Sequence, residues 1–461
     1  SGPAGLFCAW YLAKAGYCPL VLERGEEADK RQETVENFWK NGILDPDSNV
    51  QFGEGGAGTF SDGKLTTRIT HPRLHEISKY FVEFGAPEEI LYKHKPHVGT
   101  DKLRTMVKAM RERIIEWGGE VRFGSKVTDL FIENDRIVGV EVNGSERIDT
   151  TVVLSGVGHS ARDTYEMLYK RNVEMTAKPF AIGVRIEHDQ ALIDESQYGV
   201  EPSSLGLGAA EYSLVYHDKE TGRTAYSFCM CPGGFIVPAA SGPEQVVVNG
   251  MSPSNRGSRW SNSGMVVEVQ PEDLINGEWR VENEELAAQR NEQLLALNPS
   301  LNNSQLSTLN SQLLPLYFQE EQERQCWLQG GRRQTAPAQR MQDFTRKKLS
   351  YDLPESSYSP GLISSPLHFW MPEFISKRLS LGFQQFGRSS HGFLTNEAVM
   401  IGVETRTSSP VRIVRDKETL QHTTVRGLFP CGEGAGYAGG IVSAGVDGER
   451  CAEAVANYFN R

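Results

Sequence analysis

Glycines and an acid near the start of the chain have types and spacings that suit a dinucleotide. Gly2 and Gly5 have the spacing of the second and third glycines of the G-x-G-x-x-G pattern, and Pro3 suits the first position of a helix. In that pattern the second glycine lets a pyrophosphate approach the helix N-terminus, and the third lets the helix pack closely on a strand. Glu23 follows at the end of a predicted short, buried parallel strand, where an acid would hold the hydroxyls of a ribose. The alternative is an ordinary helix bounded by glycines.

The first glycine of this pattern and the strand before it are absent from the sequence. In this topology the first strand lies centrally in the sheet, so its loss would expose strand edges and apolar surface. We therefore expect the sequence to be a fragment of a longer protein, and we make no prediction about a targeting segment.

A glycine-rich segment at 49–68 is the second place where the backbone could meet a ligand. Its small residues bring many N–H groups together, with one cation at Lys64, and such a surface suits the edge of a flavin ring or a pyrophosphate. A flexible surface loop is the alternative. A flexible linker would not usually carry Phe52 and Phe60, so we favour ligand contact. The glycines are Gly53, Gly55, Gly56, Gly58 and Gly63.

A third glycine-rich motif, CGEGAGYAGGI, lies near the C-terminus. A short apolar strand leads into Gly432 and Glu433, and Gly440 and Ile441 stand before a helix of small residues over 444–459. Backbone N–H groups there would point at a ligand carbonyl, with the positive end of the helix behind them. Glu433 would accept a ribitol hydroxyl or lie near a pyrophosphate.

The composition restricts the class of protein. At roughly 100–200 residues per domain, 461 residues allow two to four domains. The net charge of −11 disfavours a nucleic-acid or anionic-membrane partner, because both reward clustered positive charge. The sequence has no apolar run of about 18 residues, so we predict no transmembrane helix. Seven scattered cysteines indicate reduced thiols, and hence the cytoplasm or an organelle interior.

The order of the predicted elements divides the chain at two places. Residues 1–177 and 391–461 carry short apolar strands and strand–glycine–helix corners, which are typical of an α/β domain with a parallel sheet. Residues 178–390 contain antiparallel strand patterns and amphipathic helices at 282–298 and 304–327. We therefore predict one α/β domain that is split by an inserted α+β domain.

A meander of short strands is predicted between residues 120 and 155. Asn134-Asp135 and Asn143-Gly144 are turn signals that separate these strands. Val127 would lie where the backbone of one strand meets an adenine.

These motifs resemble those of FAD-dependent oxidoreductases with a glutathione-reductase-like Rossmann fold. More closely, the chain is similar to the bacterial and plastid family of FAD-dependent dehydrogenases, or FAD-dependent proteins. The similar stretches are SGPAGL, FGEGGAGTFSDGKLTTR, FCMCPGG, GVETRTSSPVR and CGEGAGYAGGI, which are spread over nearly the whole chain. The resemblance implies an FAD-binding domain, with its first strand missing here, and a substrate domain inserted into it.

The resemblance also implies which residues contact FAD. They are Gly2, Pro3, Ala4, Gly5, Glu23, Arg24, Gly56, Ala57, Gly58, Thr59, Val127, Gly156, Gly432, Glu433, Gly440 and Ile441. The sequence departs from the pattern at two points: the first glycine is absent, and Glu433 stands where the wider class has Asp.

Residues for catalysis are indicated only by their types. Lys64, Arg406, Cys229 and Cys231 are the candidates for proton handling, substrate anchoring or thiol chemistry, with Arg185 and Ser408 as further ones. Arg406 would hold an anionic substrate or stabilise reduced flavin, and an ion pair with Glu404 or Asp62 is the alternative. Cys229 and Cys231 form a C-x-C that would act as a redox pair or lie in the core. We predict no metal, because a second cysteine pair is absent from the sequence.

The leading hypothesis is an FAD-dependent oxidoreductase that transfers two electrons between flavin and a small-molecule substrate, with NADH or NADPH as a conceivable electron donor. The alternatives are a flavin-dependent tRNA-modifying protein and an FAD-binding protein without turnover. Reduction of isoprenoid double bonds is a further variant. The sequence leaves the substrate and the oligomeric state open.

Overall fold

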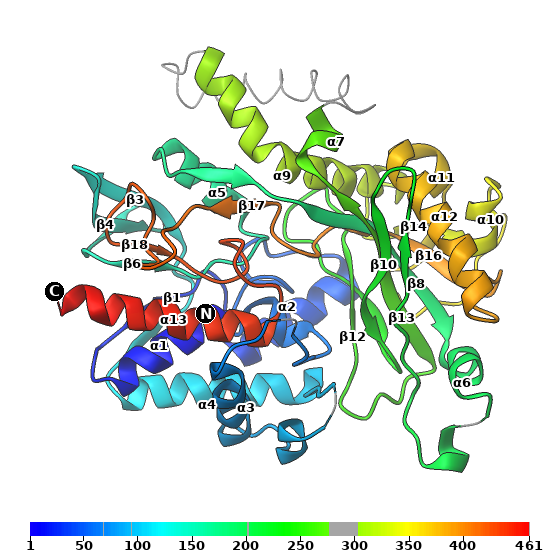
Figure 1. The fold of residues 1–461 in the computed structure, drawn as a ribbon, viewed down its shortest axis with the longest axis horizontal. Helices are drawn as coiled ribbons and strands as arrows, with labels where there is room; N and C mark the ends of the chain where they lie inside the picture. The colour runs from blue at the N-terminus through cyan, green and yellow to red at the C-terminus, as the bar shows by residue number, and fades with distance from the viewer. Residues whose placement is uncertain (68, 94, 201, 276–302, 461) are drawn as a thin grey trace.

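The computed structural model describes residues 1–67, 69–93, 95–200, 202–275 and 303–460. Two regions lie side by side (Figure 1). The split region consists of the described residues up to 178 and from 408 onward, and the inserted region consists of those between. Among the described helices, none is both long and apolar enough to cross a membrane.

Two helices from opposite ends of the sequence meet at the centre of the split region (Figure 1). A Cβ atom at Gly448 would lie 2.3 Å from the Ala4 carbonyl oxygen, and one at Gly445 would lie 2.8 Å from the Phe7 ring. Side chains do not tolerate such distances, so these glycines let the backbones of α1 and α13 touch. The helices of this region are α1 (Pro3–Lys14), α2 (Ala28–Asn41), η1 (Gly56–Phe60), α3 (Arg73–Glu83), η2 (Glu88–Leu91), α4 (Thr100–Glu116), α5 (Arg162–Lys170) and α13 (Ile441–Phe459).

Short strands of the split region form parallel pairs. β1 (Leu20–Leu22) pairs with β2 (Glu120–Arg122), and β6 (Val153–Ser155) pairs with β18 (Leu428–Pro430). The predicted parallel strand before Glu23 is confirmed, but its burial is not: Leu20 is 36% exposed, because among the described strands only β2 pairs with β1.

The predicted meander is confirmed as an antiparallel sheet beside these pairs. Its strands are β3 (Val127–Glu133), β4 (Arg136–Val142) and β5 (Glu146–Asp149). Asn134 and Asp135 both have positive φ angles, 48° and 60°, which two-residue hairpin turns require.

The inserted region is built on a seven-stranded sheet with the order β15-β14-β16-β8-β13-β10-β9. Its strands are β8 (Phe180–Asp189), β9 (Val215–His217), β10 (Thr224–Cys231), β13 (Trp260–Val269), β14 (Ala336–Arg340), β15 (Leu362–Ser364) and β16 (Val399–Glu404), and β11 (Phe235–Pro238) pairs separately with β12 (Val248–Met251). Neighbouring strands are antiparallel except for β14 and β15. The sheet therefore fits the predicted α+β class.

Helices bury this sheet and connect the two regions. They are α6 (Gln190–Tyr198), η3 (Pro202–Leu205), α7 (Pro271–Ile275), α9 (Asn303–Gln329), α10 (Met341–Thr345), α11 (Leu367–Trp370) and α12 (Glu373–Ser389). α9 confirms the helix predicted over 304–327, and the one predicted over 282–298 lies outside the described residues. Phe318 of α9 packs in the core of the sheet, whereas Leu313 and Leu316 pack against the split region, so α9 joins the two cores.

β16 lies on the other side of the domain boundary predicted at 390/391. The sequence assigned this strand to the second part of the split domain, but it pairs with β14 and β8 in the middle of the inserted sheet. An apolar strand pattern does not identify its partners, so the sequence alone could not place it. The chain returns to the split region at β17 (Val411–Ile413), which pairs with β7 (Met175–Ala177).

Candidate functional site

A cavity of about 970 Å³ lies where the inserted region meets the split region. Its lining comes from the start of α1, the ends of β1 and β6, the glycine-rich loop before η1 and the start of α13. The inserted region contributes β10, β12 and the segment that follows β16. The volume is at the upper end of the range for small-molecule and cofactor sites.

The N-terminus of α1 opens on this cavity. No described side chain caps its first turn, where Gly2 is the N-cap residue, so backbone N–H groups and the positive end of the helix dipole face the cavity. A Cβ at Gly5 would meet no atom within 4 Å, whereas one at Gly156 would lie 3.3 Å from the Gly5 nitrogen. Gly156 thus lets the end of β6 approach α1 closely, and Gly5 itself lines the cavity. This arrangement suits a phosphate-bearing group.

The N-terminus of α13 opens on the same cavity. Gly440 is its N-cap residue with a φ of 150°, and among the described side chains none caps this helix either. Gly440 and Ile441 both line the cavity. Two helix N-termini therefore direct positive potential into one space, as an anionic ligand with two separate polar parts would require.

Glu23 fixes the glycine-rich loop beside β1. Its Oε1 atom accepts hydrogen bonds from the backbone nitrogens of Gly25 and Gly53, both at 3.0 Å. The side chain is 6% exposed and still lines the cavity. An acid at this position therefore holds the loop as well as facing the predicted ribose position.

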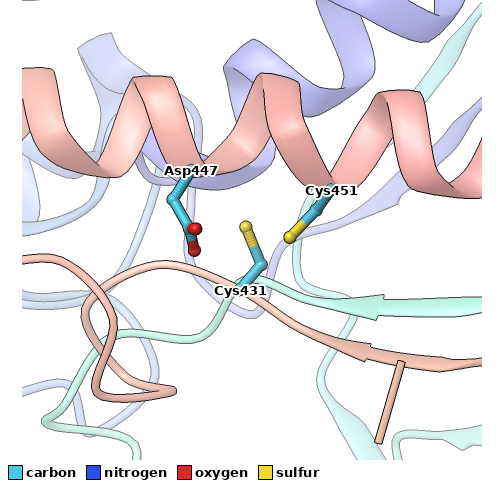
Figure 2. Close-up of side chains that lie close together, drawn as sticks. All are labelled: Cys431, Asp447 and Cys451. Atoms are coloured by element: carbon cyan, nitrogen blue, oxygen red, sulfur yellow. The ribbon is translucent and has the colours of Figure 1, made fainter. Parts of the chain in front are cut away.

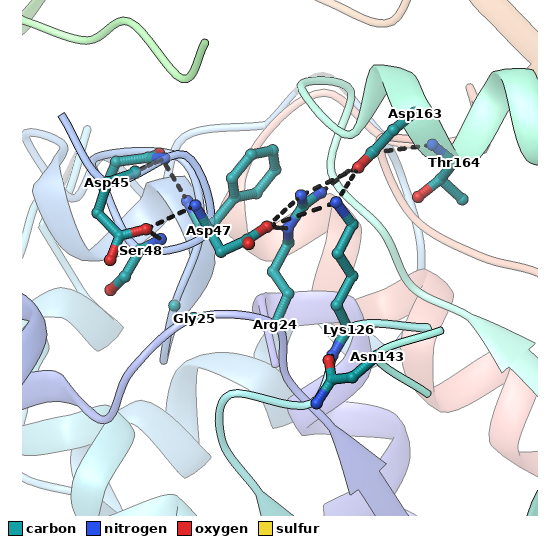
Figure 3. Close-up of polar contacts among 12 residues, drawn as sticks. Arg24, Gly25, Asp45, Asp47, Ser48, Lys126, Asn143, Asp163 and Thr164 are labelled. Atoms are coloured by element: carbon teal, nitrogen blue, oxygen red, sulfur yellow. Dashed lines mark hydrogen bonds and ion pairs between the residues drawn. The ribbon is translucent and has the colours of Figure 1, made fainter. Parts of the chain in front are cut away.

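Arg24 closes the same end of the cavity through ion pairs (Figure 3). Its guanidinium lies 2.6 Å from Asp47 and 3.0 Å from Asp163, and stacks at 4.1 Å over the Phe52 ring. Lys126 adds a 2.6 Å contact to Asp163. Burial alone would raise the pKa of Asp163, but its bonds to Arg24 and Lys126 leave that pKa below its usual value. The network joins β1, α5 and the start of β3.

A buried ion pair holds the C-terminal motif against α13. Asp447 accepts hydrogen bonds from Arg415 at 2.6 and 3.0 Å and from the Gly432 backbone nitrogen at 2.8 Å. Figure 2 shows Asp447 beside the thiols of Cys431 and Cys451, a group of three potential metal ligands. Arg415 already supplies a cation to this carboxylate and donates to Cys451 Sγ at 3.2 Å. The cluster therefore has a structural explanation.

Most of the residues predicted to contact FAD line this one cavity. Those that do so are Gly2, Pro3, Ala4, Gly5, Glu23, Arg24, Gly56, Ala57, Gly58, Val127, Gly156, Glu433, Gly440 and Ile441. Thr59 and Gly432 do not line it: Thr59 donates to the Glu54 carbonyl at 3.0 Å, and Gly432 donates to Asp447. Glu433 instead has a neighbour that sequence reasoning did not provide, because His159 Nδ1 lies 3.2 Å from its carboxylate.

The predicted catalytic residues fall into two groups. Lys64 and Cys229 line the end of the cavity next to the inserted region. Cys231 is fully buried and does not line it. Arg406 also lines the cavity, but its charge is already paired. Its guanidinium binds Glu323 of α9 at 3.1 Å, not Glu404 or Asp62, and Glu404 instead binds Arg185 at 2.8 Å.

Glu323 and Asp62 are functional candidates that the sequence did not reveal. Glu323 is fully buried and bridges Arg406 to Arg162, which lies 2.7 Å away. Nothing in the amphipathic pattern of α9 marks this position. Asp62 is 1% exposed and lines the cavity, and neither of its carboxylate oxygens has a hydrogen-bond partner among the described residues. The sequence indicated Asp62 only as an alternative ion-pair partner of Arg406.

A family model and a relative both match this chain. Residues 179–407 match the family model described as "FAD-dependent protein, C-terminal domain-like". Over all 461 residues the chain is 44% identical to an uncharacterized protein of Clostridium beijerinckii, of which it covers 80%. Among solved structures, a flavin-dependent brominase, Bmp2, is similar with a TM-score of 0.37 and 12% identity, over 100% of this chain and 79% of that one. The glycerol-3-phosphate dehydrogenase of Bacillus halodurans, complexed with FAD, gives 0.27 and 13%, over 58% of this chain and 46% of that one.

Proposed function

The chain belongs to the family of FAD-dependent proteins, and from this premise we propose that it is an FAD-dependent oxidoreductase. The reaction is a two-electron transfer between the flavin and a small-molecule substrate. One observation carries the proposal: two helix N-termini, those of α1 and α13, open on a single cavity of about 970 Å³. Such a pair suits a ligand with a pyrophosphate at one place and a polar ring at another.

The lining residues divide among the parts of FAD. The pyrophosphate would lie at the start of α1, the adenosine near Glu23 and Val127, and the flavin near Gly440 and Ile441. The loop at 56–58 would lie between the pyrophosphate and the flavin. Gly5 supports this assignment, because the space beside its Cα is open in a part of the cavity where any larger side chain would project.

Bound FAD supplies an acceptor or donor of two electrons, and the protein supplies position, charge and exclusion of water. We call the end of the cavity near Lys64, Asp62 and Cys229 the substrate end. The cation of Lys64 would stabilise negative charge that develops there. Asp62, buried without a hydrogen-bond partner among the described residues, would take or give a proton. Arg406 acts through its pair with Glu323, so we assign it a positioning role.

Anaerobic reduction of the bound flavin tests the proposal. The protein is loaded with FAD and mixed with NADH, NADPH and a panel of small hydroxy, amino and thiol compounds, and the visible flavin band is followed. We expect at least one donor to bleach the band. Lys64→Met should slow that reduction by about 10²-fold with FAD still bound, whereas Lys79→Met, an exposed lysine on α3, should not. Flavin that no donor reduces, and that no acceptor reoxidises after chemical reduction, would identify an FAD-binding protein without turnover.

A further inference from the structure

The substrate end of the cavity holds two thiols in unequal positions. Cys229 and Cys231 lie at the C-terminal end of β10, in a β-bulge where the pairing with β13 shifts register between Phe228 and Cys231. Cys229 has a φ of 45°, an unusual value for a residue other than glycine, and it is one of the residues that line the cavity. Cys231 is fully buried behind it. The bulge therefore places Cys229 at the wall of the cavity and Cys231 in the protein interior.

Charged groups from both regions surround these thiols. Lys64 of the split region donates a hydrogen bond to the carbonyl of Met230, the residue between the two cysteines. Arg185 of β8 lies 3.4 Å from the Cys229 carbonyl oxygen and 4.0 Å from Cys231 Sγ. Two acids, Asp62 and Glu404, face the same place. Arg185 is paired with Glu404 at 2.8 Å and Lys64 lies 3.9 Å from Asp62, so the two cysteines lie among two cations and two acids.

Asp62 gives an independent sign that this site takes a ligand. Its carboxylate is buried, yet the nearest cations are Arg256 Nη2 at 3.7 Å and Lys64 Nζ at 3.9 Å. Both of its oxygens lack hydrogen-bond partners among the described residues, as does His97 Nε2 nearby. Buried polar atoms are nearly always satisfied in folded proteins. The cavity therefore ends in polar atoms that a substrate would complete.

The two thiols differ in acidity as a dithiol pair requires. The pKa of Cys229 is lowered to about 5, first through the neighbouring Cys231 side chain and then because Lys64 and Arg185 lie near, while burial and Asp62 oppose the shift. The Cys229 side chain and burial raise the pKa of Cys231, whose Sγ donates a hydrogen bond to the Cys229 carbonyl oxygen at 3.3 Å. Burial also raises the pKa of Cys8 and Cys326, which lie in the core. Cys229 is thus set apart from the structural cysteines.

We propose that Cys229 and Cys231 form a redox-active dithiol at the substrate end of the cavity, with Cys229 as the thiolate that attacks a disulfide substrate. The attack forms a Cys229–substrate disulfide, breaks the substrate S–S bond and releases the first thiolate, which takes the proton of Cys231. Cys231 then attacks Cys229 Sγ and releases the second thiolate, which is protonated by solvent. The dithiol is oxidised to a disulfide and the substrate is reduced to two thiols.

Only the return step rests on the proposed function. Reduced flavin would pass two electrons and one proton to the Cys229–Cys231 disulfide, which restores one thiolate and one thiol and leaves oxidised flavin. The forward step needs a disulfide alone. The dithiol can therefore be tested whether or not the flavin takes part.

The test relies on the trypsin cleavage sites around Cys229 and Cys231. Trypsin releases residues 224–256 as one peptide, in which Cys229 and Cys231 are the only cysteines, and it releases Cys18 in a separate peptide, 15–24. The whole protein is reduced, equilibrated in glutathione buffers of increasing disulfide content, quenched with acid, alkylated and digested. We expect the first peptide to lose both alkylation sites together and two hydrogens in mass. Exposed Cys18, the internal control, should take up glutathione instead.

Variants separate the roles of the two thiols. Cys231→Ser should trap glutathione on Cys229, and Cys229→Ser should leave Cys231 unmodified under the same conditions. The pH midpoint for alkylation of Cys229, expected near 5, should rise in Lys64→Met and fall in Asp62→Asn. Two cysteines that stay alkylatable while Cys18 is glutathionylated, or that each take up glutathione without an internal disulfide, would overturn the proposal. A titration of the same samples with FAD tests the proposed function separately.

Discussion

The two ends of the cavity are built in different ways. At the split region the surface consists mainly of backbone: two helix N-termini, and glycines such as Gly5 and Gly156 that keep space open. At the end next to the inserted region it consists of side chains from both regions, among them Lys64 and Asp62 of the split region and Cys229 of the inserted region. The first end suits a cofactor whose shape is constant. Under the proposed function, the second end would meet the substrate.

The difference explains what the sequence could predict. Backbone sites need glycine at fixed spacings, so Gly2, Gly5 and Gly440 were recognisable, and the structure brings them to one cavity. Side-chain sites depend on which distant segments meet. The pairing of Arg406 with Glu323, across 83 residues, leaves no local pattern. Sequence reasoning therefore named Arg406 but gave it the wrong partner.

Topology shows the same limit. The types of secondary structure in the split region could be predicted from the spacing of apolar residues and from turn residues. The antiparallel meander with its Asn134-Asp135 turn is an example. The position of β16 was not, because its apolar residues suit the middle of either sheet. The predicted boundary at 390/391 consequently left this strand out of the inserted region.

The largest effect on stability is expected for Glu323, the buried carboxylate that pairs with two arginines beside the cavity. Glu323→Ala would leave Arg162 and Arg406 as buried cations without their carboxylate. We expect the free energy of unfolding to fall by about 3–5 kcal/mol, measured by urea denaturation. Glu321→Ala, on the same helix with a looser 3.8 Å pair to Arg324, is the matched control and should change it by less than about 1 kcal/mol. Equal losses in the two variants would contradict the bridging role of Glu323.

The pH dependence of stability sharpens this prediction. The pKa of Glu323 is lowered to about 2, because its pairs with Arg162 and Arg406 outweigh the effect of burial, against 4.5 for an unpaired group. A carboxyl group whose pKa is lower in the folded than in the unfolded protein stabilises the fold at pH values above its unfolded-state pKa. This stabilisation is lost as the pH falls toward the folded-state pKa. The difference in unfolding free energy between the wild type and Glu323→Ala should therefore narrow by about 3 kcal/mol between pH 5 and pH 2. A difference independent of pH over that range would show that Glu323 is not ionised in the folded protein.

A smaller effect is expected at the side chains that close the backbone end. Arg24→Ala removes the contacts to Asp47, Asp163 and the Phe52 ring near the predicted adenosine position (Figure 3). Because the acids are partly exposed, we expect a loss of about 1 kcal/mol in FAD affinity, or roughly fivefold in Kd, with little change in stability. Isothermal titration with FAD measures it. Arg122→Ala, at a half-buried arginine of β2 that pairs with Glu120 and Glu146, is the control. A loss of more than a hundredfold would mean that Arg24 touches the cofactor directly.

The most direct measurement of the central claim is the binding of FAD to the wild type and to Gly5→Leu. A Cβ atom at Gly5 would meet no protein atom within 4 Å, so we expect the variant to fold and its larger side chain to project into the cavity that Gly5 lines. Gly208→Leu, an exposed glycine with equally open surroundings, is the control. We predict that the wild type and Gly208→Leu bind FAD, and that Gly5→Leu retains its unfolding transition but does not bind. FAD bound equally by all three proteins would contradict the placement of the cofactor in this cavity.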